Sequence, residues 1–326
     1  MEPKVRTTLK RLGVVLFGLP LLGMSFAAKA DFPDRAIRIV LPFAVGGGVD
    51  ALVRPLAKEM SDILGQSVII DARPSANGQV GMNDVARATP DGYTIVVSSA
   101  AYAITPAFYP GLPYNTVADF KPITIVASNP LMLVASKSFP ANNLEEMIAL
   151  AKGSRGVNFA GPGVSGVHYL AAQLLAGSAG VKWHNIPYKG AGAAFPDLIG
   201  GQVDVMFDNP GSSLPQVQSD RLKLIATTGL SRSPVTPDTP TISETVKGFD
   251  AANWFILSAP AKTPDPVVQT LQTAVAKAIQ APAMRQVMER NGIAPIANSP
   301  QEAARFVKDE VQKWQTVVTE NGLKAD

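Results

Sequence analysis

The sequence contains no cysteine and only two histidines, and these absences exclude several kinds of protein. Without a thiol the chain can form no disulfide bond, has no cysteine nucleophile and offers no cysteine for lipid attachment. His168 and His184 are well separated and have no thiolate partner, so the sequence predicts no zinc-type ligand set. We therefore expect neither a metal ion nor another cofactor.

The excess of positive charge also disappears once the N-terminal segment is set apart. Residues 1–30 combine a basic start, an apolar run over Val14–Phe26 and the triplet Ala28-Lys29-Ala30, a pattern typical of a signal peptide cleaved after Ala30. This segment holds five of the 29 basic and one of the 26 acidic residues, which leaves 24 basic and 25 acidic residues and a formal charge of −1. The sequence therefore predicts export, with an uncleaved N-terminal anchor as the alternative, and gives no electrostatic reason to expect nucleic-acid binding.

The rest of the chain alternates short apolar runs with helical patterns. Ile37–Phe43 suits a buried strand, and apolar residues at helical spacing follow over Asp50–Leu64. Trp254–Pro260 returns as a strand before a helical tail that we expect to pack on the first half. We predict an α/β protein with two lobes, each a mostly parallel sheet flanked by helices. The first lobe would comprise residues 31–128 and 253–326 and the second residues 129–252, joined by two crossings that permit hinge closure.

Four loops follow predicted strands and are rich in Gly, Ser, Asn or Ala. Ligands of open parallel sheets lie outside the carboxyl ends of the strands, beside helix N-termini whose backbone N–H groups attract anions. Only one of these loops contains a charged residue, so the pattern predicts a small anion held by amides and hydroxyls in the cleft between the lobes. The four loops are Ala44–Val49, Ser99–Thr105, Gly161–Gly166 and Asp208–Ser213.

Enzymatic alternatives have weaker support. Gly161, Gly163 and Gly166 spell the dinucleotide-binding pattern, but the acid required about twenty residues later is absent from the sequence VKWHNIPY. Ser165 lacks the spacing of a nucleophile elbow, and His168 has no evident nucleophile in reach, so packing or ligand contact is favoured over catalysis. We therefore predict that the protein is not an enzyme.

Asp208 in the last loop and Asp50, which directly follows the first, have ordinary explanations too. Asp50 stands at the start of a helix, where an acid commonly caps the first turn. Asp208 follows a strand and could accept from a ligand, or it could bind groups of its own loop. Trp254 is interpreted as core or hinge packing in preference to a ligand platform.

Several segments resemble one family over essentially the whole mature chain, from about Pro33 to Gly322. The sequence is similar to the substrate-binding proteins of tripartite tricarboxylate transporters, the Bug or TctC family. The segments that carry the resemblance are PDRAIRIVLPFAVGGGVD, LGQSVIIDARPSANGQVG, ATPDGYTIVVSS, LPYNTVADFKPIT, IPYKGAGAAFPDLIGGQVDVMFDN and WFILSAPAKTPDPVV.

The resemblance implies a periplasmic, type II-like binding protein that closes two lobes on a small organic carboxylate. Such a protein would deliver its ligand to the membrane subunits of the transporter, and we expect it to be a monomer that needs no cofactor. A periplasmic adaptor that senses its ligand for a signalling system is the alternative, because the same fold serves both roles. An exported NAD-dependent or hydrolytic enzyme is a weaker alternative.

The resemblance also implies a set of ligand-binding positions on both sides of the cleft. They are Phe43, Ala44, Gly46, Gly47, Asp50, Ser99, Ala100, Gly163, Ser165, His168, Tyr188, Gly190, Ala191 and Asp208. The sequence departs from the family pattern at Ala44-Val45, where Pro-Pro is usual, and at Val49, where Thr is usual. Because Val49 removes a hydroxyl from the first loop, it predicts a less polar ligand or compensation elsewhere in the site.

Overall fold

The computed structural model describes residues 32–43, 45, 48–75, 78–153, 156–161, 166–188 and 190–324. Residues Phe32–Asp326 form one compact unit. The predicted signal peptide and its cleavage site after Ala30 lie outside the described residues. In the described part of the chain, no helix combines the length and the apolarity needed to cross a membrane.

The first sheet has six strands in the order β11-β4-β10-β3-β1-β2. Strand β1 is parallel to β2 and to β3, whereas β10 runs antiparallel to both β3 and β4. Its strands are β1 (Ile37–Leu41), β2 (Val68–Ala72), β3 (Thr94–Ser99), β4 (Phe120–Asn129), β10 (Asn253–Pro260) and β11 (Ala294–Pro295).

The second sheet has five strands in the order β7-β6-β8-β5-β9. Strand β6 is parallel to β7 and β8, whereas β5 is antiparallel to β8 and β9. Its strands are β5 (Met132–Ser136), β6 (Val157–Gly161), β7 (Trp183–Pro187), β8 (Val205–Asp208) and β9 (Leu222–Thr227).

Two α/β sheets flanked by helices confirm the predicted fold class, and each sheet is mixed. Among the antiparallel strands, β10 and β5 lie next to the chain crossings. Strand β4 leads out of the first sheet, β10 returns beside it, and β5 begins the second sheet directly after the first crossing. A chain that leaves a sheet and re-enters it next to its exit strand runs antiparallel to that strand. The hydrophobic pattern of the sequence does not show this direction. The lobe boundaries given above stay a prediction.

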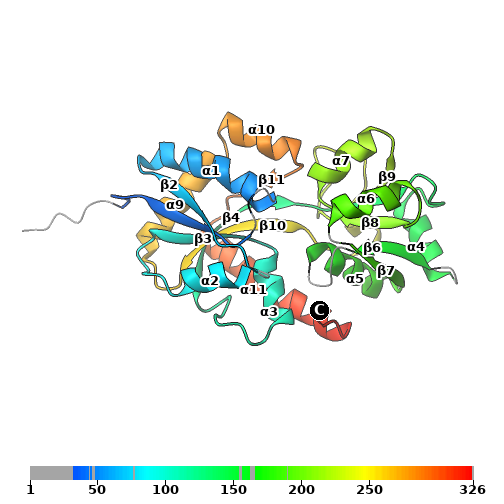
Figure 1. Cartoon of the computed structure of the whole chain (residues 1–326), viewed down its shortest axis with the longest axis horizontal. Helices are drawn as coiled ribbons and strands as arrows, with labels where there is room; N and C mark the ends of the chain where they lie inside the picture. The colour runs from blue at the N-terminus through cyan, green and yellow to red at the C-terminus, as the bar shows by residue number, and fades with distance from the viewer. Residues whose placement is uncertain are drawn as a thin grey trace, which may run out of the picture. The chain divides into compact units, whose positions relative to one another are not determined.

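Helices cover both faces of each sheet (Figure 1). In the first sheet, α1, α9 and α10 share one apolar core with the strands, and α2, α3 and α11 contribute to another. In the second sheet, α4 and α5 cover one face, and α6 and α7 cover the opposite face. The helices are α1 (Gly48–Leu64), α2 (Gln79–Ala86), α3 (Ala101–Phe108), α4 (Leu144–Lys152), α5 (Val167–Ala179), α6 (Ala191–Ile199), α7 (Pro210–Gln218), α8 (Ile242–Thr245), α9 (Asp265–Ala278), α10 (Pro282–Arg290) and α11 (Pro300–Glu320).

Two of the four predicted loops are shorter than the sequence suggested. Most of Ser99–Thr105 lies in α3, and α7 begins at Pro210 inside the segment Asp208–Ser213. Alanine is the best helix former, so Ala101 and Ala103 favour a helix in this segment, and α3 packs against α11. The consequence for the site is that helix N-termini begin almost directly at the strand ends.

A buried polar cluster joins the C-terminal helix to the second crossing. Glu310 of α11 is only 4% exposed, and its Oε2 accepts hydrogen bonds from the indole Nε1 of Trp254 at 2.8 Å and of Trp314 at 3.0 Å. Lys313 pairs with Glu310 and donates to the backbone oxygen of Asp250 at 3.2 Å. Trp254 is therefore packed in the core beside the crossing, as predicted.

Candidate ligand-binding site

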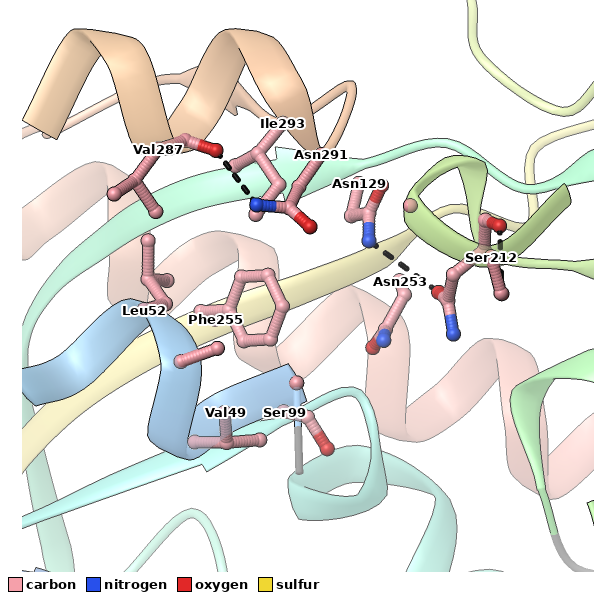
Figure 2. Close-up of a pocket in the computed structure, with 14 residues that line it drawn as sticks. Val49, Leu52, Ser99, Asn129, Ser212, Asn253, Phe255, Val287, Asn291 and Ile293 are labelled. Atoms are coloured by element: carbon pink, nitrogen blue, oxygen red, sulfur yellow. Dashed lines mark hydrogen bonds between the residues drawn. The ribbon is translucent and has the colours of Figure 1, made fainter. Parts of the chain in front are cut away.

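A cavity of about 320 Å³ lies where α1, α7, α10 and the two chain crossings meet. Each element contributes residues near one of its ends (Figure 2). The lining residues are Gly48, Val49, Ala51 and Leu52 of α1, Ser99 of β3, Asn129 of β4, Asn209, Gly211 and Ser212 at the start of α7, Asn253 and Phe255 of β10, and Val287, Asn291 and Ile293 at the end of α10.

The two crossings place one asparagine each in the wall of the cavity. Asn129 is the last residue of β4, Asn253 is the first of β10, and the two are register partners. Asn253 Oδ1 accepts from the backbone N–H of Ala100 at 3.3 Å and from that of Trp254 at 3.1 Å. Because side chains alternate along a strand, Trp254 points away from the cavity while Asn253 faces it.

A chain of hydrogen bonds links the first crossing to the second sheet. Asn129 Nδ2 donates to Asn209 Oδ1 over 3.3 Å, and Asn209 Nδ2 lies 3.1 Å from Nε2 of His168. With this orientation of the Asn209 amide, Nδ2 donates and His168 Nε2 accepts, which fits a neutral ring protonated at Nδ1. Burial lowers the pKa of His168, while Asp208 and the bond to Asn209 act in the opposite direction. A neutral His168 is thus the form that fits these hydrogen bonds.

Asp208 is turned toward its own helix. Its side chain is buried, and Oδ2 accepts from the hydroxyls of Ser212 at 2.5 Å and Ser213 at 2.7 Å. Both serines lie in the first turn of α7, so a negative charge already occupies this helix N-terminus. Asp208 holds the turn that carries Asn209 and Ser212 into the cavity wall, and it is itself absent from that wall.

The N-terminus of α1 forms the facing wall. Gly48 and Val49 line the cavity, and the carboxylate of Asp50 is buried behind them. Asp50 Oδ1 pairs with Arg54 Nε at 2.8 Å, one turn along the helix. The charge of Asp50 is therefore compensated inside α1, which leaves the helix N-terminus as the attractive feature for an anion.

The predicted site residues differ in where they lie relative to the cavity. Ser99 lines the cavity directly, and Asp50, Ala100, His168 and Asp208 lie one residue or one hydrogen bond behind it. Phe43 is partly buried against the core of the first sheet. The predicted positions that lie outside the described residues are Ala44, Gly46, Gly47, Gly163 and Ser165.

The remaining predicted residues lie at the start of α6. Tyr188, Gly190 and Ala191 are not among the residues that line this cavity. The hydroxyl of Tyr188 donates to Asp197 Oδ2 over 2.6 Å, and this bond raises the pKa of Tyr188 to about 12. Gly190 has a backbone φ of 123° and open space where a Cβ would lie. These three residues therefore lie outside the lining of the cavity.

Sequence reasoning missed the asparagines at the crossings and the contribution of α10. Asparagine is depleted in strands, so Asn129 and Asn253 at the ends of otherwise apolar runs were an available signal. Asn291 and Val287 gave no such signal, because they lie in an amphipathic helix assigned to packing. Only the fold brings α10 over the start of α1 and α7.

The described lining residues suit binding better than catalysis. They provide carboxamides, hydroxyls, backbone N–H groups and apolar side chains, and none of them is a lysine, arginine or carboxylate. Such a wall can hold and orient a small polar molecule by hydrogen bonds. It offers no general base beside a nucleophile, which acid–base or covalent catalysis would require.

Two α/β sheets joined by two crossings, with a polar cavity at the junction, form the fold of periplasmic binding proteins. A family model described as the tripartite tricarboxylate transporter family receptor matches residues 52–323. The chain therefore belongs to the TctC receptor family, a family of non-enzymatic periplasmic binding proteins.

Relatives of known sequence or structure agree with this assignment. The protein BugT of Bordetella pertussis is 32% identical over 96% of this chain and 98% of its own length. The periplasmic binding protein BugD is 33% identical with a TM-score of 0.74, covering 90% of this chain and all of that chain.

Two solved relatives from Rhodopseudomonas palustris contain organic acids. Rpa4515 with adipate has a TM-score of 0.76 at 30% identity and covers 91% of this chain and 100% of that chain. MatC with bound malate has a TM-score of 0.72 at 32% identity and covers 88% of this chain and 100% of that chain. Adipate and malate are both dicarboxylates, and each is the ligand of that relative.

Proposed function

We propose that this protein binds a small organic carboxylate in the cavity between α1, α7 and α10 and delivers it to the membrane subunits of a tripartite tricarboxylate transporter. The observation that carries the proposal is the amide- and hydroxyl-lined cavity onto which α1 opens. The N-terminus of that helix attracts an anion, and no lysine or arginine is needed to hold it. The adipate and malate complexes of two relatives support the same ligand chemistry.

The proposal includes export and a monomeric receptor. Residues 1–30 would direct the chain to the periplasm and be removed after Ala30. The mature chain would then act as a freely diffusing carrier, since it contains no cysteine for lipid attachment. Hinge closure about the crossings at Asn129 and Asn253 would bring Gly211 and Asn209 toward α1 around the ligand.

We propose that the predicted site residues act in two layers. Ser99 and the helix N-terminus at Gly48 would contact the ligand, together with Asn129, Asn209 and Asn253. Asp50, Ala100, His168 and Asp208 would orient those groups from behind. The other predicted positions are proposed as ligand contacts because of the resemblance to the family. They are Phe43, Ala44, Gly46, Gly47, Gly163, Ser165, Tyr188, Gly190 and Ala191.

The test is a thermal-shift and calorimetric panel on the mature chain. It should include di- and tricarboxylates, aromatic carboxylates, acidic amino acids and matched neutral solutes. A ligand at one hundred times its Kd should stabilise the fold by about 2.7 kcal/mol, which gives a clear rise in Tm. If neutral solutes raise the Tm and no carboxylate does, the proposed ligand class is wrong.

A matched pair of variants locates the site within the chain. Asn291 and Asn321 each follow the last residue of a helix, and each Nδ2 donates to the backbone oxygen four residues earlier, at 2.7 and 2.8 Å. Of the two, Asn291 lines the cavity. Asn291→Ala should weaken carboxylate binding at least fivefold and Asn321→Ala should not, although both lose the same local bond. Equal affinities would remove α10 from the site.

A further inference from the structure

One acceptor in the cavity wall has no donor. Asn129 is 6% exposed, and its Oδ1 is buried without a hydrogen-bond partner among the described residues. The nitrogen of the same amide donates to Asn209, which leaves the oxygen as the unpaired atom. A buried carbonyl oxygen left unpaired costs free energy, and a ligand that brings an O–H or N–H group would remove this cost.

The electrostatic character of the same wall is negative. Asp208 is buried directly behind Ser212, and its charge is shared by two serine hydroxyls without a cationic partner in the described hydrogen bonds. Burial lowers the pKa of His168 on the other side of Asn209, which disfavours a positive charge there. None of the described lining residues is a lysine or arginine. A second carboxylate placed here would therefore meet a like charge in a poorly solvated position.

The opposite part of the cavity is apolar. Figure 2 shows Leu52 and Phe255 near α1 and Val287 above them on α10, while Asn129, Asn253 and Ser212 lie toward α7. Leu52 and Phe255 are almost fully buried, at 1% and 2% exposed. The cavity thus has an apolar wall for the body of a ligand, an anion-attracting helix end at Gly48, and a donor-seeking amide at Asn129.

We propose, on the basis of the function given above, that this receptor selects a monocarboxylate that carries a hydroxyl or N–H group at some distance from the carboxylate. The carboxylate binds at the N-terminus of α1, the carbon chain lies along Leu52 and Phe255, and the donor reaches Oδ1 of Asn129. A dicarboxylate of equal length is disfavoured because its second charge faces Asp208.

Matched sets of acids at two lengths test this selectivity by calorimetry on the mature chain. One set is 6-hydroxyhexanoate, adipate and hexanoate, and the other is 4-hydroxybutanoate, succinate and butanoate. At the better-fitting length, the hydroxy acid should bind at least tenfold more tightly than both the dicarboxylate and the plain acid. A dicarboxylate that binds as tightly as the hydroxy acid overturns the selectivity and leaves carboxylate binding intact.

Two variants assign the selectivity to the named groups. Asn129→Leu should abolish the advantage of the hydroxy acid over the plain acid, because it removes the unpaired acceptor. Asp208→Asn keeps the side-chain shape and should raise the affinity of the dicarboxylate relative to the hydroxy acid by tenfold. Urea unfolding shows whether each variant is folded. If both folded variants keep the wild-type ratios, the inference is wrong.

The outcomes separate this inference from the proposed function. Failure of all six acids, with binding of other carboxylates in the wider panel, overturns the inference alone. Failure of every carboxylate, with binding of neutral solutes such as 1,6-hexanediol, overturns the proposed function and the selectivity together.

Discussion

Replacing Gly292 by alanine tests whether the end of α10 must lie against α7 for binding. Gly292 follows Asn291 after α10, has a φ of 62°, and gives its N–H to Glu289, while Ile293 bonds back to Met288. A Cβ at this position would lie 2.6 Å from Cβ of Pro210 at the start of α7. The close approach therefore joins two segments that both border the cavity.

The chain contains a natural control for the backbone effect. Gly322 follows Asn321 after α11, has a φ of 61°, gives its N–H to Thr319, and is followed by Leu323, which bonds back to Val318. A Cβ at Gly322 would have no atom within 4 Å. Both glycines thus end a helix in the same left-handed way, and only Gly292 is packed against a second element.

The expected magnitudes follow from this difference. An L-residue in the left-handed region costs about 1–2 kcal/mol, and both alanine variants incur this loss of unfolding free energy. At Gly292 the added carbon is also about 1 Å too close to the rigid ring of Pro210, since carbon atoms prefer about 3.5–4.0 Å. The segments must separate, and Asn291 and Gly211 move apart with them. We expect an affinity loss of at least tenfold, or about 1.4 kcal/mol.

The assay combines urea unfolding with calorimetric titration of the tightest carboxylate from the panel. Both variants should lose stability in the absence of ligand, Gly292→Ala at least as much as Gly322→Ala. Gly292→Ala should also lose affinity, while Gly322→Ala binds like the wild type. Equal affinity of the two variants would refute the reasoning, because the contact with Pro210 would then have no part in forming the site.

Two further predictions concern buried charge and pH. Glu310→Gln should lower the free energy of unfolding by about 2–3 kcal/mol, because it removes the charged acceptor of two indole N–H groups and the partner of Lys313, whereas Asp309→Asn on the exposed face of α11 should change it by less than about 0.5 kcal/mol. Because the pKa of His168 is lowered by burial, the unfolded chain binds this proton at a higher pH than the folded chain. Stability and carboxylate affinity should therefore fall as the pH drops from about 6.5 through the lower folded pKa, and not change through His168 above that range.

The controls for these two predictions use the same chain. Urea midpoints for Glu310→Gln and Asp309→Asn measured side by side would contradict the first if they matched. For the second, His168→Gln should flatten the pH dependence between pH 6.5 and 5, whereas His184→Gln should keep it, since His184 is exposed on β7. An unchanged pH profile in His168→Gln would show that the hydrogen bonds through Asn209 do not depend on a neutral His168 side chain.

Much of the fold was readable from the sequence because it depends on local periodicity. The apolar run at Ile37 and the helical pattern that ends at Leu64 became β1 and α1, as predicted. Asn143 caps α4 through a bond from the backbone N–H of Glu146 at 2.9 Å. The family assignment likewise follows from residues spread along the chain. The direction of β10 within its sheet was not readable, because strand polarity depends on where the chain re-enters.

The candidate site was only partly predictable. The sequence indicated the strand ends and helix starts that surround the cavity, including Ser99 and the segments at Val49 and Asn209. It did not show that Asp208 turns back to its own serines, nor that Asn129 would keep a free acceptor beside it. Those features depend on which groups satisfy one another at close range.

By itself the sequence determined the α/β class, the helix starts that attract an anion and the membership of a receptor family. The tertiary structure alone decided which residues share the cavity, because Asn129, Asn253 and Asn291 come from segments far apart in the chain. Register between β4 and β10 sets the first two opposite each other, and packing of α10 over α1 places the third. Sequence periodicity encodes which face of an element is buried, whereas the partners of a polar side chain are set by the packing of whole elements.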